Sequence, residues 1–184
     1  GIIHPDYAFF PGLAQQASER GIIGKLATLA DAFRAKGLPV FHTPVAHRPD
    51  FADVGPTNLL NALALKRKNF TVGSKEADYV DQLRPKDGDW VINRTSGIIG
   101  IVGTELDTLL RRLNVETIVL AGVSTNVGMP GNAMVAADLG YNVVIPEDCI
   151  AGSDKETHDL IVKMQLPMVA TITSSEEVMA VLGA

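Results

Sequence analysis

The sequence has very little cysteine, few aromatic residues and no long hydrophobic run. One cysteine, Cys149, stands among 184 residues, which excludes an intrachain disulfide and makes a reducing cytoplasm the expected location. No apolar segment approaches the roughly 20 residues that a membrane helix requires, and the first residues do not resemble a secretory signal. The chain also lacks a basic tract and carries a net charge of −5. We therefore expect a small-molecule partner, and neither nucleic acid nor a membrane.

The remaining composition is that of an ordinary globular protein. Hydrophobic residues make up 46% of the chain and charged residues 20%, so we predict a single domain over residues 1–184. Strand-like and helix-like patterns alternate along it. Helices are predicted at residues 24–36 and 76–83, from 104, from about 129, at 153–165 and from 174. Strands are predicted at residues 39–43, 89–93, 117–123, 142–145 and 168–172, while residues 47–69 are too irregular to assign.

This alternation predicts an α/β fold, a three-layer α/β/α sandwich around an open parallel, Rossmann-like sheet. The strand at 117–123 is apolar on both faces, as expected where helices cover both sides. Capping boxes are predicted at Thr104–Asp107, Ser153–Glu156 and Ser174–Glu177. The opening segment GIIHPDYAFFPG is typical of a loop, although a doubly wound sheet normally begins with a central strand.

Open parallel sheets bind ligands at the carboxyl ends of their strands, which directs attention to the turn at residues 123–130. A helix is predicted to begin there, and the free N–H groups of a helix N-terminus favour a carboxylate or an oxyanion. An equally supported interpretation is a tight connection in which Gly128 supplies backbone freedom.

A serine nucleophile is the alternative at this turn. Ser124, Asp148 and His158 follow the chain order of a serine hydrolase triad. However, Asn126 replaces the second glycine of the G-x-S-x-G motif, and an exposed histidine on a helix is the ordinary explanation of His158. We therefore disfavour a serine hydrolase.

Three further side chains are candidates. Arg94 follows a predicted strand, where it can pair with a substrate carboxylate, although a surface arginine is the alternative. His47 could face the cleft with Arg48, but a solvated loop is the preferred interpretation. His42 and His47 do not make a metal site, which needs three or four convergent ligands. Cys149 has an acidic neighbour, Asp148, which would raise its pKa, so we interpret it as a buried structural cysteine.

The motifs around the turn resemble those of the isochorismatase-like, or cysteine hydrolase, family. The late family motif is similar to GVSTNVGM (122–129), followed by Ala136-Ala137-Asp138, GYNVV (140–144) and Asp148. Weaker similarities are found at residues 37–40, 89–94 and 101–111. The resemblance covers about residues 1–180.

The resemblance implies a catalytic set of an aspartate, a lysine and a nucleophilic cysteine. Gly128 stands at the cysteine position and Arg94 at the lysine position. The aspartate would come just before Gly1, at the end of the first strand. We expect the sequence as given to begin after that strand, or the protein to have lost it. Loss of the strand would leave a gap at the centre of the sheet, so we favour the first alternative.

Two functions follow from this resemblance. True isochorismatases are similar in carrying glycine at the cysteine position, and they hydrolyse a vinyl ether by protonation and water attack without a covalent nucleophile. The first hypothesis is therefore such a hydrolase, acting on a small carboxylate-bearing molecule. The alternative is a catalytically inactive member that binds a small ligand.

The resemblance also implies roles for individual residues in the first hypothesis. Arg94 would bind a carboxylate, and the N–H groups of Ser124 and Gly128 would hold an oxygen of the substrate or of water. A cis peptide is implied between Val123 and Ser124. No cofactor or metal is expected, because residues 43–47 lack the Asp and His cluster of metal-binding members. A homo-dimer or tetramer is implied by the family. The residues expected to bind substrate are Val123, Thr125, Asn126 and His47.

Overall fold

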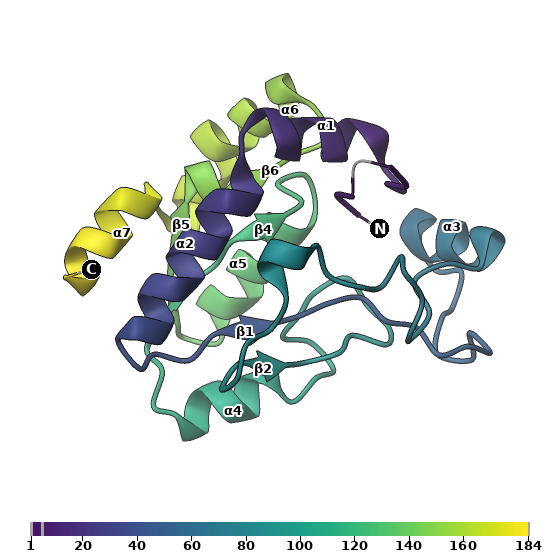
Figure 1. Cartoon of the computed structure of the whole chain (residues 1–184), viewed down its shortest axis with the longest axis horizontal. Coiled ribbons are helices and arrows are strands. Elements are labelled where there is room, and N and C mark those ends of the chain that lie inside the picture. Colours follow the sequence, from purple (N-terminus) through teal and green to yellow (C-terminus); the bar gives the residue numbers. More distant parts are fainter. Residues whose placement is uncertain (1, 5, 184) are drawn as a thin grey trace.

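Parallel strands in separate groups form the centre of this computed structural model, which describes residues 2–4 and 6–183 (Figure 1). β1 (Phe41–His42) pairs with β2 (Trp90–Val91). A second group has the order β3 (Thr117–Val119), β5 (Asn142–Pro146), β7 (Thr171–Thr173). β4 (Gly122–Val123) pairs with β6 (Ile150–Ala151). All four pairings are parallel, as the alternating pattern predicted.

Helices cover both faces of these strands. α2 (Ile22–Ala35) and α7 (Ser175–Leu182) pack on one face, and α4 (Leu106–Arg112) and α5 (Gly128–Asp138) pack on the other, so the sandwich has three layers (Figure 1). The remaining helices are α1 (Pro11–Glu19), α3 (Leu59–Arg67) and α6 (Lys155–Leu160), with a π turn at Ile161–Gln165 and 3₁₀ turns at Asp81–Leu83, Glu147–Cys149 and Leu166–Met168. Among the described residues, no helix is both long and apolar enough to cross a bilayer.

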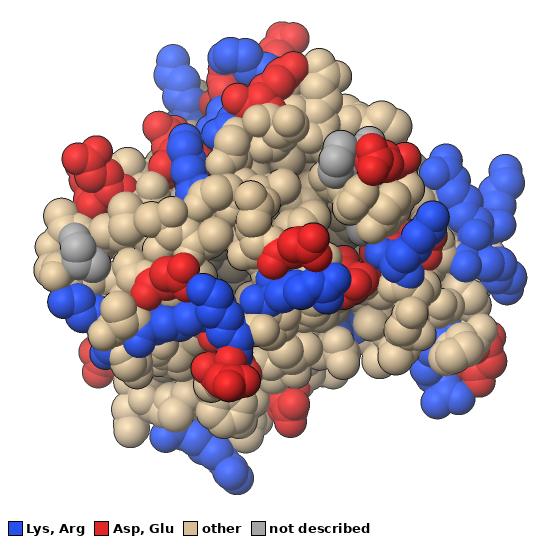
Figure 2. Space-filling model, in the orientation of Figure 1, with Lys and Arg blue, Asp and Glu red and all other residues tan. Residues whose placement is uncertain are grey.

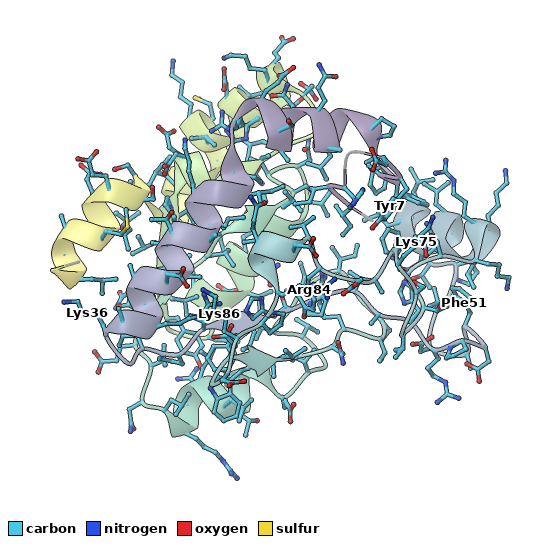
Figure 3. All side chains as sticks on the ribbon, viewed as in Figure 1. Tyr7, Lys36, Phe51, Lys75, Arg84 and Lys86 are labelled. Carbon is cyan, nitrogen blue, oxygen red and sulfur yellow. The ribbon has the colours of Figure 1, made fainter. Side chains whose placement is uncertain are left out.

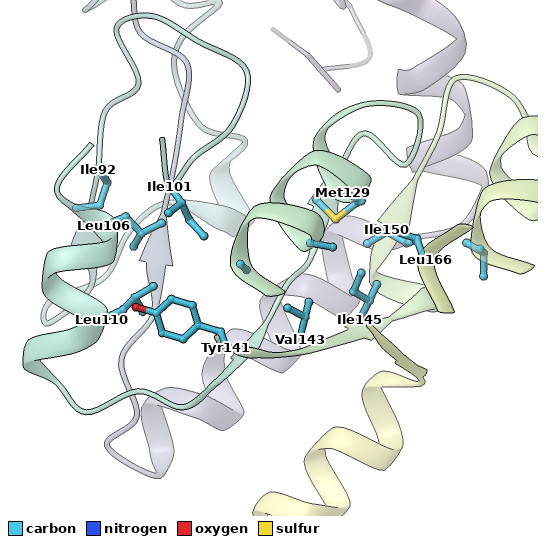
Figure 4. Packing of buried hydrophobic residues seen from close by; sticks show 13 residues of the cluster. Ile92, Ile101, Leu106, Leu110, Met129, Tyr141, Val143, Ile145, Ile150 and Leu166 are labelled. Atoms are coloured by element: carbon cyan, nitrogen blue, oxygen red, sulfur yellow. The ribbon is translucent and has the colours of Figure 1, made fainter. Parts of the chain in front are cut away.

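The larger core cluster lies between α4, α5 and β5 (Figure 4). Met129 and Ala133 of α5 pack there with Val143 and Ile145 of β5. Because strand side chains alternate, Val144 points to the opposite face and joins the cluster of α2 and α7. The helix α5, which follows the turn at 123–128, is therefore anchored by apolar packing.

A cavity of about 1870 Å³ lies between the β1–β2 pair and the group of β3, β5 and β7. It is lined by Phe41 of β1 on one side and Val119 of β3 on the other, and by apolar side chains of α2 such as Leu29 and Phe33. Among the described residues, no strand joins the β1–β2 pair to the group of β3, β5 and β7. The predicted ligand edge opens into the same cavity.

Several local predictions differ from the structure. Residues 76–83 form only the 3₁₀ turn at Asp81–Leu83. Residues 47–69 contain α3, whose N-cap is Asn58; its side chain accepts a hydrogen bond from the N–H of Asn61 (3.0 Å). The sequence pattern concealed α3 because its apolar residues do not all face a core, and Leu59 is 73% exposed.

Of the three predicted capping boxes, one forms. Ser174 and Glu177 cap α7 reciprocally, as predicted. The α6 N-cap is Asp154 rather than Ser153, and its carboxylate accepts from the N–H of Thr157 (2.8 Å). Thr104 instead donates to the carbonyl of Gly100 (2.7 Å), because the chain before α4 turns back onto itself.

The N-terminal segment packs against residues 67–75 through cation–π contacts. The ammonium of Lys75 lies 4.8 Å from the Tyr7 ring, and the two side chains meet in Figure 3. The guanidinium of Arg67 lies 4.3 Å from the ring of Phe9. On the face shown in Figure 2, acidic and basic side chains stand next to one another.

A buried ion pair fixes the β1–β2 pair against α2. The Asp89 carboxylate, before β2, accepts from Nε (3.0 Å) and Nη2 (2.6 Å) of Arg34 on α2 and lies 2.9 Å from Nε2 of His42 on β1. Only 2% of the Asp89 side chain is exposed. The hydrogen bonds from Arg34 hold the pKa of Asp89 well below its ordinary range.

We expect Asp89→Asn to lower the free energy of unfolding by about 3 kcal/mol, because it removes the buried acid of Arg34 and leaves that cation only the exposed carboxylate of Asp31 (2.6 Å). Since the pKa of Asp89 is depressed on folding, its stabilisation is complete above the ordinary carboxyl pKa of about 3.9 and is lost as the pH falls below it. Urea titrations should therefore show a smaller gap between variant and wild type at about pH 3 than at about pH 7. The control is Asp50→Asn, whose exposed pair with Arg48 (2.8 Å) should matter little. Equal losses from both variants would contradict this prediction.

Candidate functional site

The turn between β4 and α5 is the centre of the candidate site. The Val123–Ser124 peptide bond is cis, as the resemblance implies. The N–H of Thr125 donates to the carbonyl of Ala151 on β6 (2.8 Å), which holds the turn against the sheet. Among the residues that the structure describes, the N–H groups of Ser124 and Gly128 donate to no protein acceptor. Both groups are therefore free to bind an oxygen atom at the positive end of α5.

Two side chains of the turn support it from behind. The hydroxyl of Thr125, which is fully buried, lies 2.9 Å from Nδ1 of His158. Oδ1 of Asn126 accepts from the N–H of Ser153 (2.7 Å). A Cβ on Gly152 would lie 2.8 Å from that oxygen, so only glycine fits beside it. Thr125 and Asn126 thus fasten the turn to the segment after β6, and their contact with a substrate stays a prediction.

The side chains of the alternative serine triad have other partners. His158 is buried rather than exposed on its helix, so that interpretation is wrong, and burial lowers the pKa of its imidazole. The Asp148 carboxylate accepts from the N–H (2.8 Å) and the hydroxyl (2.6 Å) of Ser175. Within the described part of the chain, Ser124, Asp148 and His158 share no hydrogen bond. The geometry therefore agrees with our argument against a serine hydrolase.

Arg94 carries a partly buried positive charge at the same end of the sheet. Its Nε donates to the carbonyl of Thr43 (3.1 Å), and its Nη1 donates to the carbonyl of Ile98. No ion pair found among residues 2–4 and 6–183 includes Arg94. Burial lowers the pKa of its guanidinium, which still stays charged because arginine is not deprotonated in proteins. A partly buried cation that has no acidic partner among the described residues favours an anionic ligand.

His47 is buried, with 4% of its surface exposed, so the interpretation as part of a solvated loop is wrong. Its Nδ1 lies 2.7 Å from the carbonyl of Thr95, and its N–H donates to the carbonyl of Phe70 (2.7 Å). The prediction failed because it used the polar residues next to His47 in the sequence, whereas Thr95 and Phe70 are distant in the sequence. The predicted role of His47 in substrate binding stays a prediction.

Asn132 is a candidate that the sequence analysis missed. Its Nδ2 donates to the carbonyl of Gly128 (2.8 Å), and its Oδ1 accepts from the N–H of Gly100 (2.8 Å). The available signal was weak: asparagine is disfavoured in a helix interior, where its side chain competes for backbone groups. Here both amide atoms have such partners.

These groups share the cavity described above. The predicted residues Val123, Asn126 and His47 line it, whereas the buried Thr125 does not. No cluster of three or more His, Cys, Asp or Glu side chains suited to a metal ion occurs among the described residues. The polar residues that line the cavity near the turn are Thr43, His47, Arg94, Ser124, Asn126 and Asn132.

Cys149 lies away from this site. It packs with Leu29 of α2 and Val178 of α7, and it is fully buried. Burial, together with the neighbouring charge of Asp148, raises the pKa of its thiol to about 11. The interpretation of Cys149 as a buried structural cysteine is therefore confirmed.

Known proteins resemble this chain along most of its length. The family model of the isochorismatase domain matches residues 2–177. The uncharacterized isochorismatase family protein YecD of Escherichia coli O157:H7 is 31% identical, over 92% of this chain and 87% of that protein. The maleamate amidohydrolase of Pseudomonas putida is 27% identical, over 84% of this chain and 68% of that protein. The crystal structure of an isochorismatase family protein from Desulfovibrio vulgaris superposes with a TM-score of 0.79 at 28% identity, covering 89% and 85% of the two chains.

We expect Cys149 to resist alkylation by iodoacetamide in the folded protein. At about pH 8, a pKa of about 11 leaves roughly one thiol in a thousand ionised, and burial blocks access to it. Mass spectrometry should show one adduct per chain only after unfolding in guanidinium. Rapid labelling of the native protein would contradict this assignment.

Proposed function

Since the chain belongs to the isochorismatase family, a family of hydrolases, we propose that it hydrolyses a small carboxylate-bearing molecule without a covalent cysteine nucleophile. The scissile bond is a vinyl ether or a related bond. One observation carries this proposal: among the described residues the partly buried guanidinium of Arg94 has no acidic partner, and it shares a cavity with the free N–H groups of Ser124 and Gly128.

A carboxylate suits this arrangement for two reasons. Arg94 already uses Nε and one N–H of Nη1 on backbone carbonyls, which leaves the other N–H of Nη1 and both N–H groups of Nη2 for charge-assisted hydrogen bonds to a ligand. The N–H of Gly128 points outward at the first residue of the eleven-residue helix α5, where the helix dipole favours negative charge. The maleamate named for one relative also carries a carboxylate.

The lack of a thiol at the turn directs the chemistry toward water. Gly128 has no side chain, and Cys149 is packed on the opposite face of the sheet. An acyl-enzyme on cysteine is therefore not available to this site. In the proposed reaction the N–H groups of Ser124 and Gly128 hold an oxygen of the substrate or of the attacking water. The aspartate that the resemblance implies as the proton donor stays a prediction.

Ligand binding without turnover is the second candidate function. It is favoured by the same contacts of Arg94, because a guanidinium tied to Thr43 and Ile98 neither moves freely nor exchanges protons near neutral pH. The hydroxyl of Ser124 also has no base bonded to it within the described residues. The two candidates predict the same ligand and differ only in whether a product forms.

We expect wild-type protein to release pyruvate from isochorismate, measured with a coupled lactate dehydrogenase assay. Arg94→Ala should lower kcat/KM by about 10- to 100-fold, the size of one hydrogen bond to a charged group. Arg20→Ala is the matched control, because Arg20 also donates to two backbone carbonyls, those of Ile150 (3.1 Å) and Glu147 (2.9 Å), outside this cavity. Arg20→Ala should lower the stability as much as Arg94→Ala does, but its kcat/KM should equal that of the wild type.

The outcomes separate the two candidate functions. Equal kcat/KM for Arg94→Ala and wild type would refute the role of Arg94. Isochorismate binding that depends on Arg94 but yields no pyruvate would establish the binding function instead. If isochorismate is neither bound nor hydrolysed, both candidate functions are refuted for this ligand.

Gly128→Cys probes whether the turn suits a nucleophile. The new Cβ would lie 3.2 Å from the carbonyl oxygen of Val123, so a small local shift is needed. The helix N-terminus should lower the pKa of the new thiol, and we expect rapid iodoacetamide labelling and a gain of maleamate hydrolysis. Gly128→Ala controls for the added Cβ and should show neither. An unreactive thiol in a folded Gly128→Cys variant would refute our placement of the reacting atoms.

A further inference from the structure

Residues 95–100 supply part of one cavity wall through Gly97 and Ile98, and three polar contacts from other parts of the chain hold this segment. His47 Nδ1 contacts the carbonyl of Thr95 (2.7 Å). Arg94 Nη1 donates to the carbonyl of Ile98. At the far end of the segment, the N–H of Gly100 donates to Oδ1 of Asn132 on α5 (2.8 Å).

Asn132 is the contact that joins this wall to the turn. Its planar amide accepts from Gly100 with one atom and donates to the carbonyl of Gly128 with the other. Two glycines permit the close approach. A Cβ on Gly131 would lie 2.2 Å from Cδ1 of Ile99, and a Cβ on Gly100 would lie 3.2 Å from Oδ1 of Asn132.

These bonds connect the two anion-binding groups of the site. The connection runs from the guanidinium of Arg94 to Ile98, along the backbone to Gly100, across the side chain of Asn132 and into Gly128. A rigid amide that both accepts and donates fixes the separation of the two backbones. Aspartate at this position would lack the donor, and alanine would lack both atoms.

We propose that Asn132 is a positioning residue that sets the placement of the Arg94 guanidinium relative to the Gly128 N–H, and so selects where a ligand carboxylate sits. This inference rests on the proposed carboxylate site. Asn132 does not itself need to touch the ligand, since it acts through the wall at residues 95–100 and through the turn. Mutation of Asn132 should therefore change ligand affinity more than it changes the fold.

The experiment measures two quantities in the wild type and in variants of Asn132: the rate of hydrogen exchange at the Gly100 N–H, and the affinity for benzoate by calorimetry. Asn132→Ala should speed exchange at Gly100 and weaken benzoate binding about tenfold, the size of one net hydrogen bond. Asn132→Asp keeps an acceptor for Gly100, so exchange should stay slow. It should nevertheless weaken benzoate more than Asn132→Ala does, because its charge competes with the ligand at the positive end of α5.

Ser174→Ala is the control for lost stability, because it removes the N-cap hydrogen bond of α7 and should change neither readout. Benzoate affinity in Asn132→Ala equal to that of wild type would overturn the inference while leaving the carboxylate site intact. Wild-type protein that does not bind benzoate would overturn the carboxylate site and, with it, the inference. Unchanged Gly100 exchange in Asn132→Ala would show that the side chain does not hold the wall.

Discussion

The charge of Arg94, which has no acidic partner among the described residues, is the constraint on which the proposed site depends. A cation removed from water is costly unless something compensates it, and here backbone carbonyls of Thr43 and Ile98 supply only part of that compensation. The free N–H groups at the start of α5 lie in the same cavity and have the same preference for negative charge. Two unsatisfied positive groups in one cavity make a carboxylate the natural complement.

The rest of the structure holds these two groups in place. Met129 and Ala133 of α5 pack against β5, which fixes the helix that carries the free N–H groups. On the other side, the buried pair of Asp89 and Arg34 fixes β1 and β2, the strands that lead to Arg94. The site therefore lies between two separately anchored halves, with the cavity between them.

Local signals were sufficient for some elements, although two of the three predicted capping boxes do not form. The α7 capping box, the burial of Cys149 and the strand-turn-helix around Gly128 depend on neighbouring residues and were predicted. Failures occurred where distant partners decide the outcome. The ring and the N–H of buried His47 contact the carbonyls of Thr95 and Phe70, and Asn132 accepts a hydrogen bond from Gly100, which lies 32 residues away. α3 was missed because its helical pattern has no clear buried face.

In the turn at residues 123–128, different residues govern two properties: the position of a bound oxygen atom and the identity of the attacking group. The backbone of the turn determines where an oxygen atom would sit, through Thr125, Asn126 and their partners after β6. In the proposed function the attacking group depends on the identity of residue 128, and that position carries none of those supporting bonds through a side chain. One substitution there could therefore exchange a water-based for a thiol-based reaction while the architecture persists. In evolutionary terms, such a scaffold lets reaction class diverge faster than fold.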